Sequence, residues 1–353
     1  MPSFFLIKFV PMIIRSKAPL RLGLAGGGTD VSPYADLHGG SILNATINMF
    51  AHTTIIPKDN GKIHFEAQDI DIHETHEAIE NIEPTGKLAL LKGVYNRIVK
   101  DFVKRPLSFE MYTSVDAPPG SGLGSSSTLV VSIIGAFAEW WNIPLGEYDI
   151  AHLAYEIERE DLGLNGGRQD QYAATFGGFN FMEFYENDKV IVNPLRVKQK
   201  YAAELENNLV LFYMGTNRES AGIIDQQTAN IKKNNENALE ATHRLKTQSI
   251  KMKEVVLMGK MDKIGKVMHD GWESKKRMAS GISNPEIDAI YETAIQNGAT
   301  GGKISGAGGG GFFFFYCPAV SRMKLIRSLE KFGVTPQNYS FTKTGLYTYT
   351  LPS

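Results

Sequence analysis

A run of proline, glycine and serine has the residue types of an anion-binding loop. The run is Pro118-Pro119-Gly120-Ser121-Gly122-Leu123-Gly124-Ser125-Ser126-Ser127. The prolines end a strand-like segment, the glycines allow backbone amides to turn inward, and the serines cap a helix whose first amides are unpaired. Free N–H groups and the helix dipole would then meet on one anion such as a phosphate, and serine hydroxyls at the helix start can also ligate Mg²⁺. The alternative is a plain glycine turn before a capped helix.

The spacing in this run excludes one well-known phosphate motif. No lysine follows Gly124, so the run is not a Walker A loop. A second glycine-rich run, at residues 306–311, contains the pattern G-x-G-x-x-G, but a dinucleotide-binding turn must open a helix. The strand-like Phe312 to Tyr316 follows instead, which favours a glycine loop that approaches another loop or a ligand.

Two carboxylates lie further along the chain, on either side of another glycine loop. Glu158 falls near the end of an amphipathic segment, and Asp170 follows Gly166-Gly167-Arg168-Gln169. A carboxylate at a helix end and a second one after a loop would suit a Mg²⁺ ligand and a catalytic base. The alternative is a solvated helix end and an ordinary turn aspartate.

Near the start, Arg21 and Asp30 bracket a glycine loop that contains Gly27, Gly28 and Thr29. Such a loop could present the Asp30 carboxylate to sugar hydroxyls. The segment His73-Glu74-Thr75-His76 contains metal-ligand residue types, but it lacks the H-E-x-x-H spacing and favours no metal site.

The elements that must position these residues follow from hydrophobic periodicity, which predicts an α+β protein. The segment 53–65 indicates a hairpin around Asp59-Asn60-Gly61, and the tail 340–351 alternates like a strand. Helices are predicted at 88–99, 125–141 and 145–160, with two more over 220–258. Other strands are predicted at 179–184, 190–192, 209–213 and 312–316. We expect two domains, residues 12–195 and 196–353, with residues 1–11 as an extension outside the fold.

Composition excludes several classes of function. Among 353 residues, 37 are basic and 38 acidic, a balance that argues against a nucleic-acid-binding protein. The one cysteine, Cys317, can form neither an internal disulfide nor a thiolate metal site. The apolar runs are too short to span a bilayer. We therefore expect a cytoplasmic protein with no nucleic-acid or membrane partner.

Together these segments resemble the GHMP kinases, the family of galactokinase, homoserine kinase and mevalonate kinase. Three motifs carry the resemblance, in order and across nearly the whole chain. They are Ala18-Pro19-Leu20-Arg21 through Thr29-Asp30, then Pro118 to Ser127, then Lys303-Ile304-Ser305-Gly306 through Gly310. The resemblance implies a ribosomal protein S5 domain 2-like N-terminal domain that binds ATP and a ferredoxin-like C-terminal domain.

The resemblance also implies roles for matching residues. Asp170 matches the catalytic aspartate, and Arg21 matches an arginine near the transferred phosphate. Asp30 matches an aspartate that holds sugar hydroxyls. Ser126 and Glu158 match Mg²⁺ ligands. The chain departs from galactokinase at Gly27-Gly28, where that enzyme has glutamate and histidine, so galactose is not implied as the substrate.

Within the family, the motifs look most like those of the D-glycero-D-manno-heptose 7-phosphate kinases, which phosphorylate the anomeric hydroxyl. The alternatives are an L-fucokinase-like or galactokinase-like kinase of a neutral sugar, and a regulator that binds sugar and ATP without catalysis. We expect ATP with Mg²⁺, a sugar phosphate as partner, and leave a homodimer open. Candidate cations for a distal phosphate are Lys17, Arg218 and the run Lys275-Lys276-Arg277.

Overall fold

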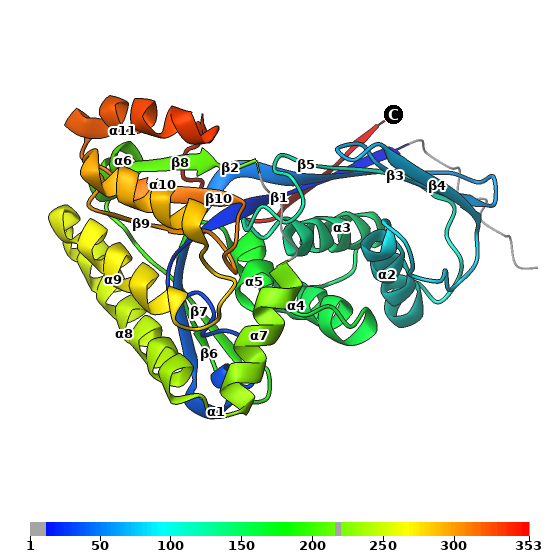
Figure 1. The fold of residues 1–353 in the computed structure, drawn as a ribbon. Helices are drawn as coiled ribbons and strands as arrows, with labels where there is room; N and C mark the ends of the chain where they lie inside the picture. The colour runs from blue at the N-terminus through cyan, green and yellow to red at the C-terminus, as the bar shows by residue number, and fades with distance from the viewer. Residues whose placement is uncertain (1–11, 216–219, 353) are drawn as a thin grey trace, which may run out of the picture.

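The computed structural model describes residues 12–215 and 220–352, and two β-sheets organise them (Figure 1). The first sheet has eight strands, in the order β12-β1-β2-β5-β3-β4, with β6 paired to β2 and β7 paired to β6. Its strands are β1 (Met12–Ala25), β2 (Gly40–Pro57), β3 (Lys62–Ala67), β4 (Ile72–Glu77), β5 (Phe109–Val115), β6 (Phe179–Phe184), β7 (Val190–Pro194) and β12 (Tyr347–Pro352).

The second sheet has four strands in the order β11-β8-β10-β9. They are β8 (Leu209–Tyr213), β9 (Gly301–Ile304), β10 (Phe312–Tyr316) and β11 (Thr335–Gln337). The helices of the first half are α1 (Tyr34–His38), α2 (Ala89–Ile98), α3 (Ser125–Trp141), α4 (Glu147–Glu156) and α5 (Gln169–Phe176). Those of the second half are α6 (Gln199–Asn208), α7 (Ser220–Lys232), α8 (Glu236–Met258), α9 (Ile264–Lys276), α10 (Pro285–Gln296) and α11 (Arg322–Leu329). The expected α+β class is confirmed.

The core is divided among the two sheets and the seam between them. Helices α2, α3 and α4 cover one face of the first sheet, and their apolar side chains form one cluster with those of β3 and β5. Strand β10 is buried on both faces: Phe312 and Phe314 pack toward β1, β2 and α8, whereas Phe313 and Phe315 pack under α10 and α11. Successive side chains of β10 point to opposite faces of the strand, so one strand contributes to two core clusters and joins the second sheet to the first.

Several predicted elements are confirmed, among them α3 at residues 125–141 and the strands at 179–184, 209–213 and 312–316. The predicted hairpin at 53–65 is wrong. Strands β2 and β3 both form, but β5 lies between them, antiparallel to β2 and parallel to β3. Ser108, just before β5, takes the place of a hairpin partner: its carbonyl accepts the Lys58 amide at 2.9 Å.

The C-terminal tail returns to the first sheet. Only Tyr347–Pro352 forms a strand, shorter than the predicted 340–351, and it pairs antiparallel with β1. All other strands of the first sheet precede residue 195, and all strands of the second sheet follow it. The division into 12–195 and 196–353 stays a prediction, with the reservation that β12 completes the sheet of the earlier unit. Within the described ranges, no helix is long and apolar enough to cross a membrane.

Candidate active site

The glycine–serine run forms a loop between β5 and α3, and the first strand holds it in place. Helix α3 begins at Ser125, directly after Gly124 in the left-handed conformation. The Arg21 backbone amide donates to the Leu123 carbonyl at 3.1 Å, and the Arg21 guanidinium donates to the Gly122 carbonyl at 2.6 Å. The loop amides at the start of α3 are therefore oriented by contacts with β1, as an anion site requires.

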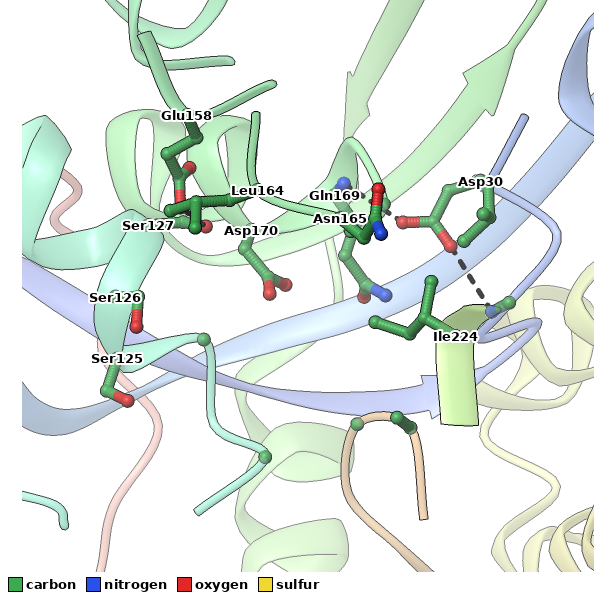
Figure 2. Close-up of a pocket in the computed structure, with 18 of the residues that line it drawn as sticks. Asp30, Ser125, Ser126, Ser127, Glu158, Leu164, Asn165, Gln169, Asp170 and Ile224 are labelled. Atoms are coloured by element: carbon green, nitrogen blue, oxygen red, sulfur yellow. Dashed lines mark hydrogen bonds between the residues drawn. The ribbon is translucent and has the colours of Figure 1, made fainter. Parts of the chain in front are cut away.

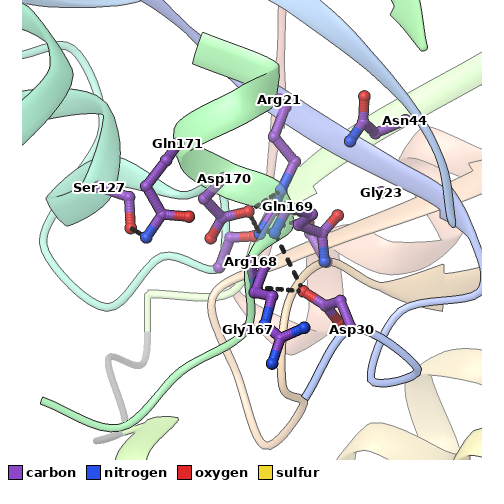
Figure 3. Close-up of polar contacts among 12 residues, drawn as sticks. Arg21, Gly23, Asp30, Asn44, Ser127, Gly167, Arg168, Gln169, Asp170 and Gln171 are labelled. Carbon is purple, nitrogen blue, oxygen red and sulfur yellow. Dashed lines mark hydrogen bonds and ion pairs between the residues drawn. The ribbon is translucent and has the colours of Figure 1, made fainter. Parts of the chain in front are cut away.

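The same arginine binds the second candidate carboxylate (Figure 3). Nε and Nη2 of Arg21 each lie 2.6 Å from Oδ1 of Asp170. Arg21 is almost wholly buried, whereas Asp170 lies in the first turn of α5 and lines the pocket. Because both contacts use Oδ1, Oδ2 is the carboxylate oxygen that Arg21 leaves free.

The third motif packs against the glycine–serine loop at residues 118–127, here called the phosphate loop. The contact is made between the two backbones. Ser305 Oγ donates to the Gly122 carbonyl at 2.8 Å, and a Cβ on Gly306 would lie 2.8 Å from the Gly122 α-carbon. A Cβ on Gly311 would lie 2.3 Å from the Ser121 carbonyl oxygen. The expectation that this glycine run approaches another loop rather than opening a helix is confirmed by these contacts.

Asp30 fastens the first glycine loop to the start of α5. Its Oδ2 accepts the backbone amides of Arg168 at 3.0 Å and Gln169 at 3.2 Å, and its Oδ1 accepts the Gly28 amide at 3.2 Å. A Cβ on Gly167 would lie 1.9 Å from Oδ2, so this approach requires glycine there. Asp30 lines the pocket and, in addition, fixes the helix turn that carries Asp170.

Glu158 is buried at the other side of the pocket, in a π-helical turn, Ile157–Asp161, that follows α4. Local π-helical turns change the direction of a side chain within a helix and often occur at functional sites. Oε1 accepts Ser127 Oγ at 3.0 Å and Oε2 accepts Gln171 Nε2 at 2.5 Å. Burial raises the pKa of Glu158, and the Arg159 charge nearby opposes that rise. The alternative interpretation of Glu158 as part of a solvated helix end is therefore wrong.

These groups line one cavity of about 280 Å³ (Figure 2). Glu158 lies at one end with Ser125, Ser126 and Ser127, Asp170 lies in the middle, and Asp30 lies with Ile224 of α7 at the other end. The remaining polar lining comes from both halves of the chain: Arg21, Arg159, Asn165, Gln169, Gln227 and Lys275. The second half of the chain thus supplies one wall of the site.

A second cavity opens beside the serines and is mostly apolar. It measures about 420 Å³ and shares Ser125 and Ser126 with the first cavity. Its apolar lining comes from the ends of β3 and β5, the start of α2 and helix α3, and includes Ala67, Ile70, Leu88, Leu91, Val115 and Leu129. An apolar adenine pocket between residues 53 and 95 is expected from the sequence and stays a prediction; part of the lining of this cavity, from Ala67 to Leu91, falls in that range.

Some predicted site residues lie elsewhere. Lys17 is on β1, with its Nζ 4.9 Å from the centre of the Phe50 ring, and it does not line the cavity. Thr29 directs its hydroxyl to the Ser41 carbonyl at 3.0 Å, so it shapes the loop. In the His73–His76 segment, Glu74 binds His76 and Lys92, and no metal-binding cluster of His, Cys, Asp and Glu occurs among the described residues. Arg218 lies outside the described residues.

Sequence reasoning missed several residues that the fold brings to the site. Ser305 binds the phosphate loop, Gln171 binds Glu158, and Gln227 lines the far wall. Ser305 lies within the third motif and Gln171 directly follows Asp170, so both could have been identified as site residues from the sequence. Gln227 had none, because it sits in a polar helix whose packing depends on the meeting of the two halves.

A glycine loop at a helix start, with one carboxylate beside its serines and another facing the cavity, is the arrangement of a phosphoryl-transfer site. The sequence pattern of the GHMP kinases N terminal domain matches residues 89–178, and that of the GHMP kinases C terminal domain matches residues 252–335. A D-glycero-alpha-D-manno-heptose 7-phosphate kinase of Campylobacter jejuni is 51% identical over 333 residues, which cover 94% of this chain and 98% of that protein.

The chain therefore belongs to the GHMP kinase family, and it is a phosphotransferase that acts on a sugar hydroxyl with ATP as co-substrate. A solved D-glycero-D-manno-heptose 1-phosphate kinase of Bacteroides thetaiotaomicron is 42% identical, with a TM-score of 0.83 over 96% of this chain and 100% of that one. An L-fucokinase/L-fucose-1-P guanylyltransferase of Bacteroides fragilis is 25% identical over 84% of this chain but only 34% of its own length. Among these relatives, the likeness to heptose phosphate kinases is the stronger.

The buried Glu158 carboxylate predicts a measurable cost in stability. A raised pKa in the folded protein means that stability is fully present below the ordinary pKa of the carboxyl group and is lost as pH rises through the folded value. We expect Glu158→Gln to raise the melting temperature of the ligand-free protein near neutral pH, because its amide oxygen can accept from Gln171 and its amide NH2 can donate to Ser127 Oγ. The gain should shrink as the pH falls and the wild-type carboxyl takes up its proton, which the raised pKa of Glu158 places above the ordinary range of a glutamate.

Differential scanning calorimetry across this pH range measures the effect. Glu160→Gln is the matched control, because this carboxylate lies in the same turn and its side chain is exposed. A lower melting temperature for Glu158→Gln at neutral pH would contradict the assignment of Glu158 as a destabilising buried charge.

Proposed function

We propose that the protein phosphorylates the anomeric hydroxyl of D-glycero-D-manno-heptose 7-phosphate with ATP and yields the 1,7-bisphosphate and ADP. One observation carries the proposal: the Arg21–Asp170 pair is joined to both the phosphate loop and the loop that Asp30 holds. The acceptor choice is supported by the likeness to heptose phosphate kinases over nearly the whole chain. Such a product serves reactions that activate the anomeric carbon of heptose.

The chain's own residues define the proposed reaction. The amides of residues 120–127 bind the phosphates of ATP, and the apolar cavity beside Ser125 and Ser126 takes the adenine. Oδ2 of Asp170 accepts the proton of the anomeric hydroxyl, whose oxygen then forms a bond to the γ-phosphorus. The bond from that phosphorus to the bridging oxygen breaks, and ADP leaves with the electron pair. Arg21 stabilises the charge of the moving phosphoryl group.

The donor set fits Mg²⁺. Proteins usually bind this ion through one or two carboxylates, with phosphates and waters completing the shell. Glu158 provides a buried carboxylate whose protein contacts include two neutral donors, Ser127 and Gln171, and Ser126 lines the cavity beside it. We therefore propose that Glu158 and the Ser126 hydroxyl hold Mg²⁺, with Ser127 orienting Glu158. When bound, the ion neutralises charge on the β- and γ-phosphates.

The metal assignment predicts a shifted Mg²⁺ requirement. We expect Glu158→Gln and Ser126→Ala each to raise the Mg²⁺ concentration at half-maximal activity, because each removes or weakens a hard oxygen ligand. Activity measured against Mg²⁺ at saturating sugar and ATP gives this value. Ser121→Ala serves as a loop control, because Ser121 is buried and does not line the cavity that Ser126 and Glu158 share. An unchanged Mg²⁺ requirement in both test variants would place the ion elsewhere.

The acceptor is the most direct test of the proposed function. We expect kcat/KM for heptose 7-phosphate to exceed that for galactose, fucose and mannose by orders of magnitude. The relatives' names differ in the position of the phosphate, so heptose 1-phosphate belongs in the same panel. We expect no turnover of heptose 1-phosphate, because its anomeric oxygen is already esterified.

Coupled measurement of ADP release, with the product's phosphorus resonances assigned by NMR, identifies the reacting hydroxyl. Better turnover of fucose than of either heptose phosphate would support the L-fucokinase-like alternative. Binding of sugar and ATP without turnover would support the alternative of a regulator that binds both ligands without catalysis.

A further inference from the structure

A buried lysine from the second half of the chain lines the acceptor end of the cavity. Lys275 is the penultimate residue of α9, and only 4% of its surface is exposed. Its Nζ donates to the Gly27 carbonyl at 3.0 Å. An ammonium carries three donors, and among the described residues this carbonyl is the one acceptor within hydrogen-bond distance. Among the residues that the structure describes, none forms an ion pair with Lys275.

A second buried donor lies beside it. Gln227 of α7 is 4% exposed, and its Nε2 is buried without a hydrogen-bond partner among the described residues. A Cβ on Gly28 would lie 2.8 Å from Lys275 Nζ and 3.3 Å from Gln227 Oε1, so the two side chains meet above that glycine. Both residues line the cavity. A buried donor without a hydrogen-bond partner destabilises the folded protein unless a bound ligand accepts its hydrogen bond.

The position of this pair matches the departure from galactokinase noted in the sequence. Where galactokinase carries glutamate and histidine before Thr-Asp, this chain has Gly27 and Gly28. At Gly28, the missing side chain leaves space that Lys275 Nζ and Gln227 Oε1 occupy, whereas a Cβ on Gly27 would meet nothing within 4 Å. The wall at Gly28 therefore carries a cation, which favours an anionic sugar over a neutral one.

The place of the pair along the cavity fits the far end of the acceptor. Asp170 lies between the serine loop at one end and Asp30 at the other (Figure 2). Gly28, over which the pair meets, is bound to Asp30 through its amide. A sugar whose reacting hydroxyl faces Asp170 therefore extends its other end toward Lys275.

We infer that Lys275 and Gln227 form the subsite that binds the distal phosphate of the acceptor, with the Gly28 backbone as its floor. The inference rests on the proposed function, in that it assumes a sugar phosphate as acceptor, and it names the residues that select it. Lys303, the other buried lysine nearby, donates to the carbonyls of Gly23 and Ile304 and does not line the cavity, so it fixes backbone instead. Arg159 also lines the cavity, but it donates to the Leu164 and Gly167 carbonyls and lies 3.9 Å from Glu158.

Protonation of the subsite agrees with this use. Burial lowers the pKa of Lys275 to about 8, while the Asp30 carboxylate opposes the decrease. The charged groups that face Lys275 are Asp30 from the glycine loop and Lys303 from β9. The cation is thus present below about pH 8 and is lost above it, whereas a phosphate monoester gains its second charge above about pH 6. Selection for the phosphorylated sugar should be greatest between these values.

The test compares Lys275→Met with Lys276→Met, a neighbour on the same helix that pairs with Glu273 at 2.8 Å. Each variant is assayed with heptose 7-phosphate and with the unphosphorylated heptose, across pH. We expect Lys275→Met to lower kcat/KM for the phosphorylated sugar by about 10- to 10²-fold, the loss of one charged hydrogen bond. KM for ATP and kcat/KM for the unphosphorylated sugar should stay within about twofold. The wild-type decrease above about pH 8 should disappear in the variant.

Gln227→Glu is the second variant, because it keeps the side-chain volume and places a carboxylate where the phosphate would bind. It should also lower kcat/KM for heptose 7-phosphate selectively. The inference is overturned if both variants keep the wild-type preference for the phosphorylated sugar. If instead the wild type prefers another sugar phosphate and Lys275→Met loses that preference, the subsite stands and only the heptose assignment fails.

Discussion

The active site depends on one buried guanidinium. Arg21 lies in the second half of β1, contacts the carboxylate of Asp170 on α5 and the carbonyl of Gly122 in the phosphate loop, and lies 3.3 Å from Ser305 Oγ of the third motif. Three segments that are more than 100 residues from Arg21 along the chain are thus oriented by one planar group with five donors. Charge-assisted bonds of this kind fix direction as well as distance, so the phosphate site and the base cannot shift independently.

The glycines around this pair are needed because two loops touch through their backbones, which leaves no room for Cβ atoms. The phosphate loop and the third motif touch through Gly122, Gly306 and Gly311, each in the left-handed conformation. Any larger residue would separate the two halves of the chain at the point where the cavity forms. The charged groups that line the cavity are costly in the ligand-free protein, since Glu158 and Lys275 are both buried without full compensation. The site therefore keeps groups whose favourable partners arrive with the substrates.

The sequence predicts the local parts of this account well. Glycine, proline and serine in ten residues indicate the loop, and the apolar run from Ser125 to Trp141 indicates the buried helix, because both signals are local. The hairpin prediction failed because pairing with β5 depends on a strand about 45 residues away, whose apolar residues must also be buried. Helix periodicity could not foresee the π-helical turn that directs Glu158 inward. The basic run 275–277 is a candidate for the distal phosphate from the sequence, but the burial of Lys275 within that run, and Gln227 beside it, depend on packing between segments far apart in the chain.

The coupling between Arg21 and Asp170 tests the central claim most directly. A double-mutant cycle on kcat/KM, with Arg21→Met, Asp170→Asn and the combined variant, measures whether the two act as one unit. The account predicts strong non-additivity: the double variant should be about as impaired as the worse single variant, as found for catalytic groups that work together. Calorimetry on the same three proteins separates this effect from unfolding. If the two losses simply multiply while all three proteins stay folded, Arg21 does not act through Asp170, and the account is contradicted.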